Sequence, residues 1–278
     1  MQDAFAHCAE LVRAADRDRF IASLFAPAEK RGALHALYAF NAEVARVREV
    51  AHAALPGEIR LQWWSDVIGG ERAEEARANP VAAALLATID GYRLPSTKLL
   101  ELIEAHRFDL YDDPMATLAD LETYARKTSA ALIALAVQIL AGEEADAVAE
   151  PAGVAYALAG LLRAFPLHLA RHQLYVPQEL LESHEVHLHD LFAGRSSPGL
   201  GAALAELRRV ARHYLATAGE RMSTLPPPAI PALLPVALVR ALLDRLQRSR
   251  PLTHVELAPW RRQWLIWRAA RNPARIAR

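Results

Sequence analysis

Alanine and leucine dominate this sequence, and no run of β-branched residues is long enough to suggest a strand. Both residues favour helices, and the apolar positions recur mostly at helical rather than strand spacing. The sequence therefore predicts an all-α protein whose helices pack around a shared core. Its 278 residues, 53% of them hydrophobic, can bury a sizeable core, and we expect residues 1–278 to form one domain.

Proline and glycine indicate where the helices begin and end. Asn79-Pro80 predicts a helix start, because asparagine caps a helix and proline suits its first turn. Pro56-Gly57 predicts a turn before a helix over 58–68, and Asp112–Pro114 predicts the start of another helix.

Three longer helices are expected over 28 to about 54, 118–140 and 151–174. The third is apolar around most of its circumference, which is typical of a buried helix. Pro166 lies inside it and should kink it, because proline lacks the backbone N–H.

Near the end of the chain, Trp260, Trp264 and Trp267 recur at helical spacing. A stripe of this kind usually packs into the core, and we expect these three side chains to be buried.

Composition argues against several classes of protein. The 32 basic and 32 acidic residues give a net charge of +0, without the basic excess typical of nucleic-acid partners. The single cysteine, Cys8, allows no internal disulfide. The first residues lack the pattern of a signal peptide. The longest apolar stretch, 130–140, is far short of the roughly 20 residues of a membrane span, so we expect at most peripheral membrane contact.

Three segments share an order and spacing with a known enzyme family. Residues 20–50 contain Leu-Tyr-Ala-Phe, residues 121–142 carry a tyrosine at 124, and residues 160–177 end in Tyr-Val-Pro. In this order they resemble the squalene/phytoene synthase family, the head-to-head prenyltransferases. The resemblance covers nearly the whole chain and implies the isoprenoid-synthase fold, a single-domain helical bundle around a central cavity.

The resemblance also implies a metal site, and its ligands are missing here. In that family, aspartates four residues apart on two helices hold Mg²⁺, which binds the prenyl diphosphates and draws off diphosphate. The four aspartate positions fall on Ala45, Glu49, Ala164 and His168. Three of the four carboxylates are therefore absent, and no catalytic residue is assigned.

Other family positions are partly kept. The arginine before the second motif remains as Arg163, whereas a polar pair upstream reads Ala157 and Gly160 and a later arginine reads Gln173. The side chains that we expect to line the cavity are Phe20, Tyr38, Asn41, Glu43, Glu49, Tyr124, Arg163, His168 and Tyr175.

Two of these positions raise further possibilities. A buried Glu43 needs a partner, for which Arg163 and Arg46 are candidates. His168 and His172 lie four residues apart, so on one helix face they could bind a metal together with Glu43 or Glu49. Such histidines are more often simply polar side chains that line a cavity.

The loss of the aspartates, together with Phe-Asn-x-Glu-Val-Ala after Tyr-Ala, is similar to one divergent branch of the family. That branch includes a mitochondrial assembly factor for respiratory complex I. The resemblance implies a bacterial cytoplasmic or mitochondrial matrix protein, peripheral to the inner membrane at most, with complex I subunits as partners.

Three functions remain open from the sequence. The first is a non-catalytic protein that holds an isoprenoid, another lipid or a partner segment and needs no cofactor. The second is an active prenyltransferase with a rewired site at Glu49 and His168; the family's cofactor would be Mg²⁺, which histidine binds poorly. The third is an interaction protein whose cavity is packed shut.

Overall fold

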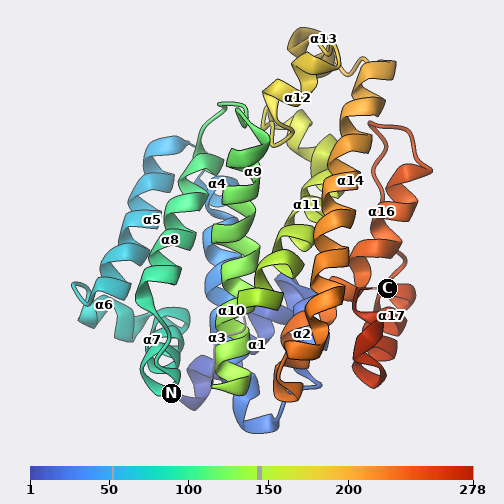
Figure 1. Ribbon diagram of the computed structural model, residues 1–278. Helices are drawn as coiled ribbons and strands as arrows, with labels where there is room; N and C mark the ends of the chain where they lie inside the picture. Colours follow the sequence, from blue (N-terminus) through green and yellow to red (C-terminus); the bar gives the residue numbers. More distant parts are fainter. Residues whose placement is uncertain (52, 143–145, 278) are drawn as a thin grey trace.

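The computed structural model describes residues 1–51, 53–142 and 146–277, and Figure 1 shows them as a bundle of helices without a strand. The predicted all-α fold is confirmed. The α-helices are α1 Gln2–Ala15, α2 Arg17–Ser23, α3 Ala28–Ala45, α4 Val47–Ala51, α5 Ala54–Gly69, α6 Ala73–Ala78, α7 Pro80–Tyr92, α8 Ser96–His106, α9 Leu118–Ala125, α10 Ala131–Ala141, α11 Asp146–Ala170, α12 Gln178–Ser183, α13 Leu188–Phe192, α14 Pro198–Arg221, α15 Ile230–Leu233, α16 Val239–Gln247 and α17 Pro259–Arg271. The 3₁₀ turns are Arg107–Leu110, Met222–Thr224, Pro227–Ala229, Leu234–Leu238 and Pro273–Arg275.

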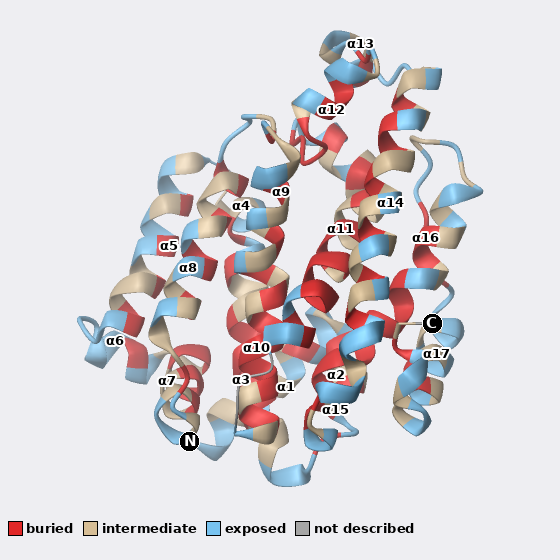
Figure 2. Cartoon of the chain, viewed as in Figure 1, coloured by how far each residue is buried: buried red, intermediate tan, exposed pale blue. Residues whose placement is uncertain are grey.

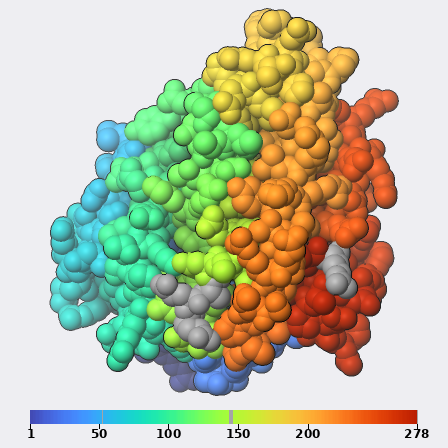
Figure 3. All heavy atoms as spheres, viewed as in Figure 1, coloured from blue at the N-terminus to red at the C-terminus, as the bar shows by residue number. Residues whose placement is uncertain are grey.

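Helix α11 is central to the bundle. It packs along α14 and against α10, while α3 packs against α1, α7 and α10. Buried residues, red in Figure 2, concentrate on α3, α10 and α11. In the space-filling view, α14 forms an orange band between the green residues of α9 and the red C-terminal residues (Figure 3).

One π-helical turn, Arg126–Ala130, joins α9 to α10 and meets α11 closely. A Cβ atom placed on Gly153 of α11 would lie 2.2 Å from the Cα atom of Ala130. Only glycine permits this approach, so Gly153 lets α11 pack directly against the backbone of the π-helical turn.

Several predicted helix boundaries agree with the structure. The Asn79 side chain accepts hydrogen bonds from the backbone N–H groups of Val81 and Ala82, which confirms it as a cap. The expected helix over 151–174 is α11, which begins five residues earlier, at Asp146, and ends at Ala170 with Pro166 inside it.

Other boundaries were predicted wrongly. Pro56-Gly57 lies in the first turn of α5 instead of in a turn before it; the missing side chain of Gly57 leaves room for Leu110. The expected helix from residue 28 to about 54 ends at Ala45, and residue 52 lies outside the described residues. The helix expected to start near Asp112 starts at Leu118, where Thr117 and Asp120 form a capping box.

The prediction that the tryptophan stripe packs into the core was wrong. Trp260, Trp264 and Trp267 are 69%, 45% and 49% exposed. Helix α17 buries Ile266 and Ala269 instead. At about 100° per residue, these two residues lie on the side of α17 opposite the tryptophans.

One described helix, α11, is long and apolar enough to span a membrane by length and composition alone. Residues of α11 are largely buried against the other helices. A core helix passes the same test, so this is weak evidence for a span.

Candidate functional site

The two segments that correspond to the family's aspartate motifs meet in space. Arg171 Nη1, just past the end of α11, lies 2.6 Å from Glu49 Oε1 on α4. Arg46 Nε forms a second ion pair with Glu49, at 3.3 Å. Hydrogen bonding from Arg171, followed by that from Arg46, keeps the pKa of Glu49 below its usual value. The Glu49 carboxylate is therefore already neutralised by two guanidinium groups.

His168 lies at the same end of α11. Its imidazole ring packs on Tyr175 with 4.7 Å between ring centroids, and its Nδ1 atom is buried without a hydrogen-bond partner. Burial lowers the pKa of His168 to about 4, so the ring is neutral at neutral pH.

The expected pairing of His168 with His172 was wrong. Helix α11 ends at Ala170, and His172 adopts a left-handed backbone with φ of 56°. Its ring stacks on Phe192 of α13, with centroids 5.3 Å apart. The two histidines therefore do not share a helix face.

The side chains at this place do not fit the magnesium site that the family resemblance implies. Ala45 and Ala164 offer no oxygen, Glu49 is ion-paired, and His168 is a nitrogen donor, whereas Mg²⁺ requires oxygen ligands. Across the described residues, no three His, Cys, Asp or Glu side chains are arranged to hold a metal ion.

A buried hydrogen-bond network centred on Asp109 lies beside His168. The Asp109 carboxylate accepts hydrogen bonds from Tyr175 at 2.7 Å and from Tyr124 at 3.0 and 3.1 Å. His106 Nδ1 lies 2.6 Å from the same carboxylate, and Gln173 donates to the Asp109 backbone carbonyl at 3.2 Å. Two predicted cavity residues, Tyr124 and Tyr175, therefore use their hydroxyl groups in this network.

The tyrosine hydroxyls of this network hold their protons strongly. Burial, and then the charge of Asp109, raise the pKa of both Tyr124 and Tyr175. Arg48 of α4 closes the outside of the network by donating to the backbone carbonyls of Asp109 and Tyr111 at 3.1 and 3.0 Å. The tyrosine hydroxyls therefore stay protonated and bound to Asp109.

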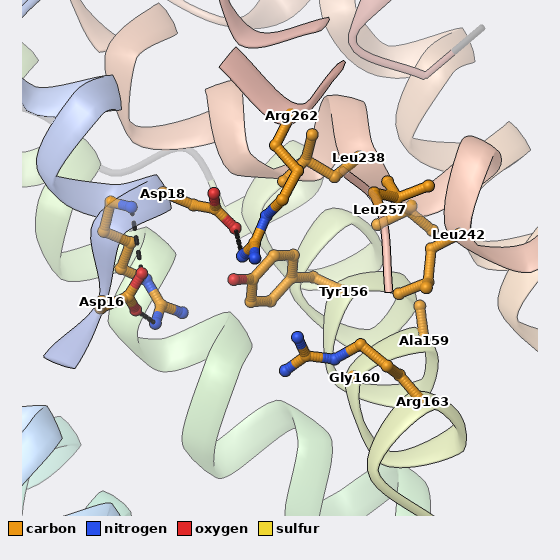
Figure 4. A pocket seen from close by; sticks show the side chains of 12 residues that line it. Asp16, Asp18, Tyr156, Ala159, Gly160, Arg163, Leu238, Leu242, Leu257 and Arg262 are labelled. Carbon is orange, nitrogen blue, oxygen red and sulfur yellow. Dashed lines mark hydrogen bonds and ion pairs between the residues drawn. The ribbon is translucent and has the colours of Figure 1, made fainter. Parts of the chain in front are cut away.

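A pocket of about 260 Å³ opens elsewhere, between α2, α11, α16 and α17 (Figure 4). Two ion pairs lie at its polar end. Arg19 donates to Asp16 at 2.6 Å within α2 and its N-cap, and Arg262 of α17 donates to Asp18. Burial raises the pKa of Asp18, against the effect of Arg262.

Aromatic rings hold Arg19 in place at this end. Its guanidinium lies 5.7 Å from the ring centroid of Tyr38 and 5.1 Å from that of Tyr156, distances at which a cation is attracted to a ring face. Burial opposes the charge of Arg19, but Asp16, Tyr156 and Tyr38 together outweigh it, and the pKa of Arg19 is raised. Burial also raises the pKa of Tyr156 to about 12.

Arg163 supplies a charge that the two ion pairs do not match. Its side chain leaves α11 and extends into the same space as Tyr156 and Arg262 (Figure 4). No hydrogen bond or ion pair to a described residue holds it. With Asp16 and Asp18 ionised, three arginines and two aspartates leave one net positive charge in the pocket.

The other wall of the pocket is apolar. It consists of Leu238, Val239, Leu242, Leu257 and Ala159, all buried. The pocket therefore offers aliphatic surface beside an unmatched guanidinium, an arrangement suited to a molecule with an apolar tail and an anionic head.

The remaining predicted residues lie apart from this pocket. Phe20 stacks on His35 with centroids 5.5 Å apart, and Asn41 is half-buried on α3. Burial raises the pKa of Glu43, and its charged neighbours are Arg60 and His7. The expected partners of Glu43, Arg163 and Arg46, were therefore wrong.

Comparison with known proteins tests the resemblance. The profile of the squalene/phytoene synthase family matches residues 12–268. This chain belongs to the squalene/phytoene synthase family.

Relatives within this family fall into two groups. The chain is 28% identical to human NADH dehydrogenase (ubiquinone) complex I, assembly factor 6, over 87% of this chain and 73% of that protein. It is 29% identical to a phytoene synthase of Thermus thermophilus, over 95% of this chain and 93% of the enzyme.

A solved structure supports the fold of this family member. A dehydrosqualene synthase crystallised with a ligand superposes with a TM-score of 0.81, covering 96% of this chain and 95% of that one at 18% identity. The isoprenoid-synthase fold expected from the three sequence segments is confirmed.

Sequence reasoning missed Asp16, Asp18, Arg19 and Arg262 of the pocket, and Asp109 of the network. The run Asp16-Arg17-Asp18-Arg19 directly before Phe20 was an available signal, because so many charges at the start of an apolar helix need partners. Nothing local in the sequence indicated that Arg262 would supply one of them from 244 residues away.

Proposed function

We propose that this squalene/phytoene synthase family protein is non-catalytic, binds an isoprenoid or related lipid with an anionic head, and assists the assembly of respiratory complex I. In this proposal it needs no metal cofactor. The pocket between α2, α11, α16 and α17 is the binding site, and Arg163 recognises the head group.

The observation that carries the proposal is the unmatched charge of Arg163 beside an aliphatic wall. An arginine forks two N–H donors toward a carboxylate or phosphate, and such charge-assisted bonds are strong in a partly buried site. The two ion pairs already in the pocket leave Arg163 available for a ligand.

The chemistry of the former metal site supports a binding role over prenyl transfer. A prenyl cation forms only when the leaving diphosphate is stabilised. The family resemblance implies four aspartates whose bound metal supplies this stabilisation. Their positions here hold two methyl groups, an ion-paired carboxylate and a neutral imidazole.

The role in complex I assembly rests on the relatives. Assembly factors of complex I from several animals match 87–89% of this chain. In a bacterium the protein would act in the cytoplasm, and in an organelle in the mitochondrial matrix, in either case at the membrane that holds complex I.

The binding site is tested with ligands that separate head from tail. Farnesyl phosphate carries both, farnesol only the tail, and inorganic phosphate only the head. We expect calorimetry to detect farnesyl phosphate binding. Farnesol should bind at least about tenfold more weakly, since loss of a charged hydrogen bond costs about 1.5–3 kcal/mol. Phosphate should also bind at least about tenfold more weakly, because it buries no apolar surface.

Arg163→Gln should weaken farnesyl phosphate binding by about tenfold or more and leave farnesol binding unchanged. The matched control is Arg209→Gln on α14, because this side chain is 74% exposed and does not line the pocket. Equal loss in both variants, or none in Arg163→Gln, would reject this pocket as the site.

Catalysis is tested separately. Purified protein is incubated with farnesyl or geranylgeranyl diphosphate and Mg²⁺ or Mn²⁺, and diphosphate release is measured. Release that is abolished by Glu49→Ala or His168→Ala would overturn the non-catalytic proposal and support a rewired prenyltransferase.

The assembly role is tested by deleting the gene from its host and separating membrane complexes on native gels. Unchanged complex I would refute this role.

A further inference from the structure

Helix α17 turns its aromatic stripe away from the protein. Trp260, Trp264 and Trp267 lie opposite the buried residues Ile266 and Ala269, and all three are exposed. Figure 2 shows α17 at the edge of the bundle, with exposed and intermediate residues along it. Large exposed aromatic stripes are unusual on a monomer and indicate an external partner.

The stripe continues onto the end of α2. Leu24 and Phe25, which follow α2, are also exposed. Together with Trp267 they line a surface hollow of about 660 Å³, and Arg13 and Arg17 also line it. We call Leu24, Phe25, Trp260, Trp264 and Trp267 the tryptophan face.

The charges on α17 are of one sign. The helix contains Arg261, Arg262, Arg268 and Arg271 and no acidic residue, although the whole chain has a net charge of +0. Of these, Arg262 faces inward, where it pairs with Asp18. Several exposed arginines elsewhere have carboxylate partners, as Arg77 does in Glu74.

Arg268 and Arg271 instead lie over tryptophans. The Arg268 guanidinium is 4.7 Å from the Trp264 ring centroid, and that of Arg271 is 5.2 Å from Trp267. No carboxylate among the described side chains forms an ion pair with either arginine. Each cation and its ring are therefore presented together on the outer side of α17.

We propose that the tryptophan face and its arginines bind the surface of an anionic phospholipid membrane. Tryptophan favours the boundary between head groups and acyl chains, because its ring is apolar and its N–H is polar. Arginine beside it binds lipid phosphate, and an amphipathic helix of this composition lies in the plane of the interface. The excess of positive charge selects an anionic membrane over a neutral one.

The test is flotation of the full-length protein with vesicles of phosphatidylcholine alone or mixed with phosphatidylglycerol. We expect binding to the mixed vesicles only, weakened by added salt because exposed charges are screened. Brominated phosphatidylcholine in the mixed vesicles should quench tryptophan emission, since bromine quenches rings that reach the acyl chains.

Two double variants separate the contributions. Trp264→Ser with Trp267→Ser should reduce the quenching to that of the remaining face residue, Trp260, and Arg268→Gln with Arg271→Gln should weaken vesicle binding by about tenfold or more. Leu55→Ser with Ile59→Ser removes apolar side chains of α5 that are 71% and 63% exposed, and it should leave binding unchanged. Arg77→Gln with Arg209→Gln is the control for charge.

Failure is equally clear. Absence of wild-type binding, equal binding to neutral and mixed vesicles, or equal loss in the control variants would overturn the proposal. Wild-type protein that ignores vesicles and dimerises through the tryptophan face would replace the membrane with a second copy as the partner. Salt dependence and quenching of the wild type decide the matter even where a variant fails to fold.

Discussion

The hydroxyl group of Tyr175 donates a hydrogen bond of 2.7 Å to the carboxylate of Asp109, across 66 residues of sequence. Tyr124 and His106 contact the same carboxylate, which is 7% exposed. One buried charge thereby joins α8 with its following turn, α9 and the segment after α11. A charge in this position stabilises the fold only while all its donors remain.

Asp109→Asn should therefore lower the free energy of unfolding by about 2–4 kcal/mol. The amide presents an N–H group where the network supplies donors, so at least one buried donor loses its acceptor. Urea denaturation measures the change. Asp112→Asn, on the same segment but 69% exposed, should change the free energy of unfolding by less than about 1 kcal/mol. Equal effects of the two substitutions would show that the network adds nothing to stability.

The sequence predicted what depends on local chemistry. Asn79 was identified as a cap, because its interaction reaches only Val81 and Ala82. The order of the three family segments was sufficient to predict the fold. Helix ends at positions without a strong cap, such as Arg46, were missed, since the competition between continuing and breaking a helix is decided by packing.

What could not be predicted depends on contacts between distant residues. Asp109 could not be given a role from the sequence, because its partners Tyr124 and Tyr175 come from α9 and from the segment after α11. The tryptophan stripe was assigned to the core on its spacing alone. Spacing shows that residues share a helix face but not which face is buried, and in α17 the smaller Ile266 and Ala269 face inward.

His168 predicts a dependence of stability on pH. Its pKa falls from 6.5 to about 4 on folding, with burial as the main cause and Arg171 and Arg163 adding to it against Asp109 and Glu49. The unfolded chain therefore binds a proton more readily, and the free energy of unfolding should decrease as the pH falls from about 6.5 to about 4.

His168→Phe should flatten this dependence while keeping a ring against Tyr175. The measurement is urea denaturation at several values of pH within that interval. His189→Phe, at an exposed position of α13, is the matched control and should retain the wild-type slope. Wild-type behaviour in His168→Phe would mean that His168 does not titrate as proposed. Burial also lowers the pKa of His35, but His35 is present in every protein compared and does not account for a difference between them.

Gly153 predicts a large effect from one methyl group. Its added Cβ would lie 2.2 Å from Cα and 2.5 Å from the backbone nitrogen of Ala130, atoms that cannot move without shifting the π-helical turn. Gly153→Ala should cost about 3 kcal/mol or more of the free energy of unfolding. Gly160→Ala, in the same helix with nothing within 4 Å, should raise it by up to about 1 kcal/mol, because alanine favours the helix. Thermal melts of the two variants should move in opposite directions.

The ion pair between Asp18 and Arg262 predicts strong coupling between α2 and α17. The Asp18 side chain is 7% exposed and that of Arg262 29%, so removing either partner strands the other in a poorly solvated site. Arg262→Gln should lower the free energy of unfolding by about 3 kcal/mol, and a double-mutant cycle with Asp18→Asn should give a coupling of about 1–3 kcal/mol. The same cycle on Glu74 and Arg77, which are 89% and 75% exposed, should give about 0.5 kcal/mol or less. If the two cycles gave equal couplings, the buried pair would contribute no more than a surface contact, and α17 would be held on the bundle by its apolar residues alone.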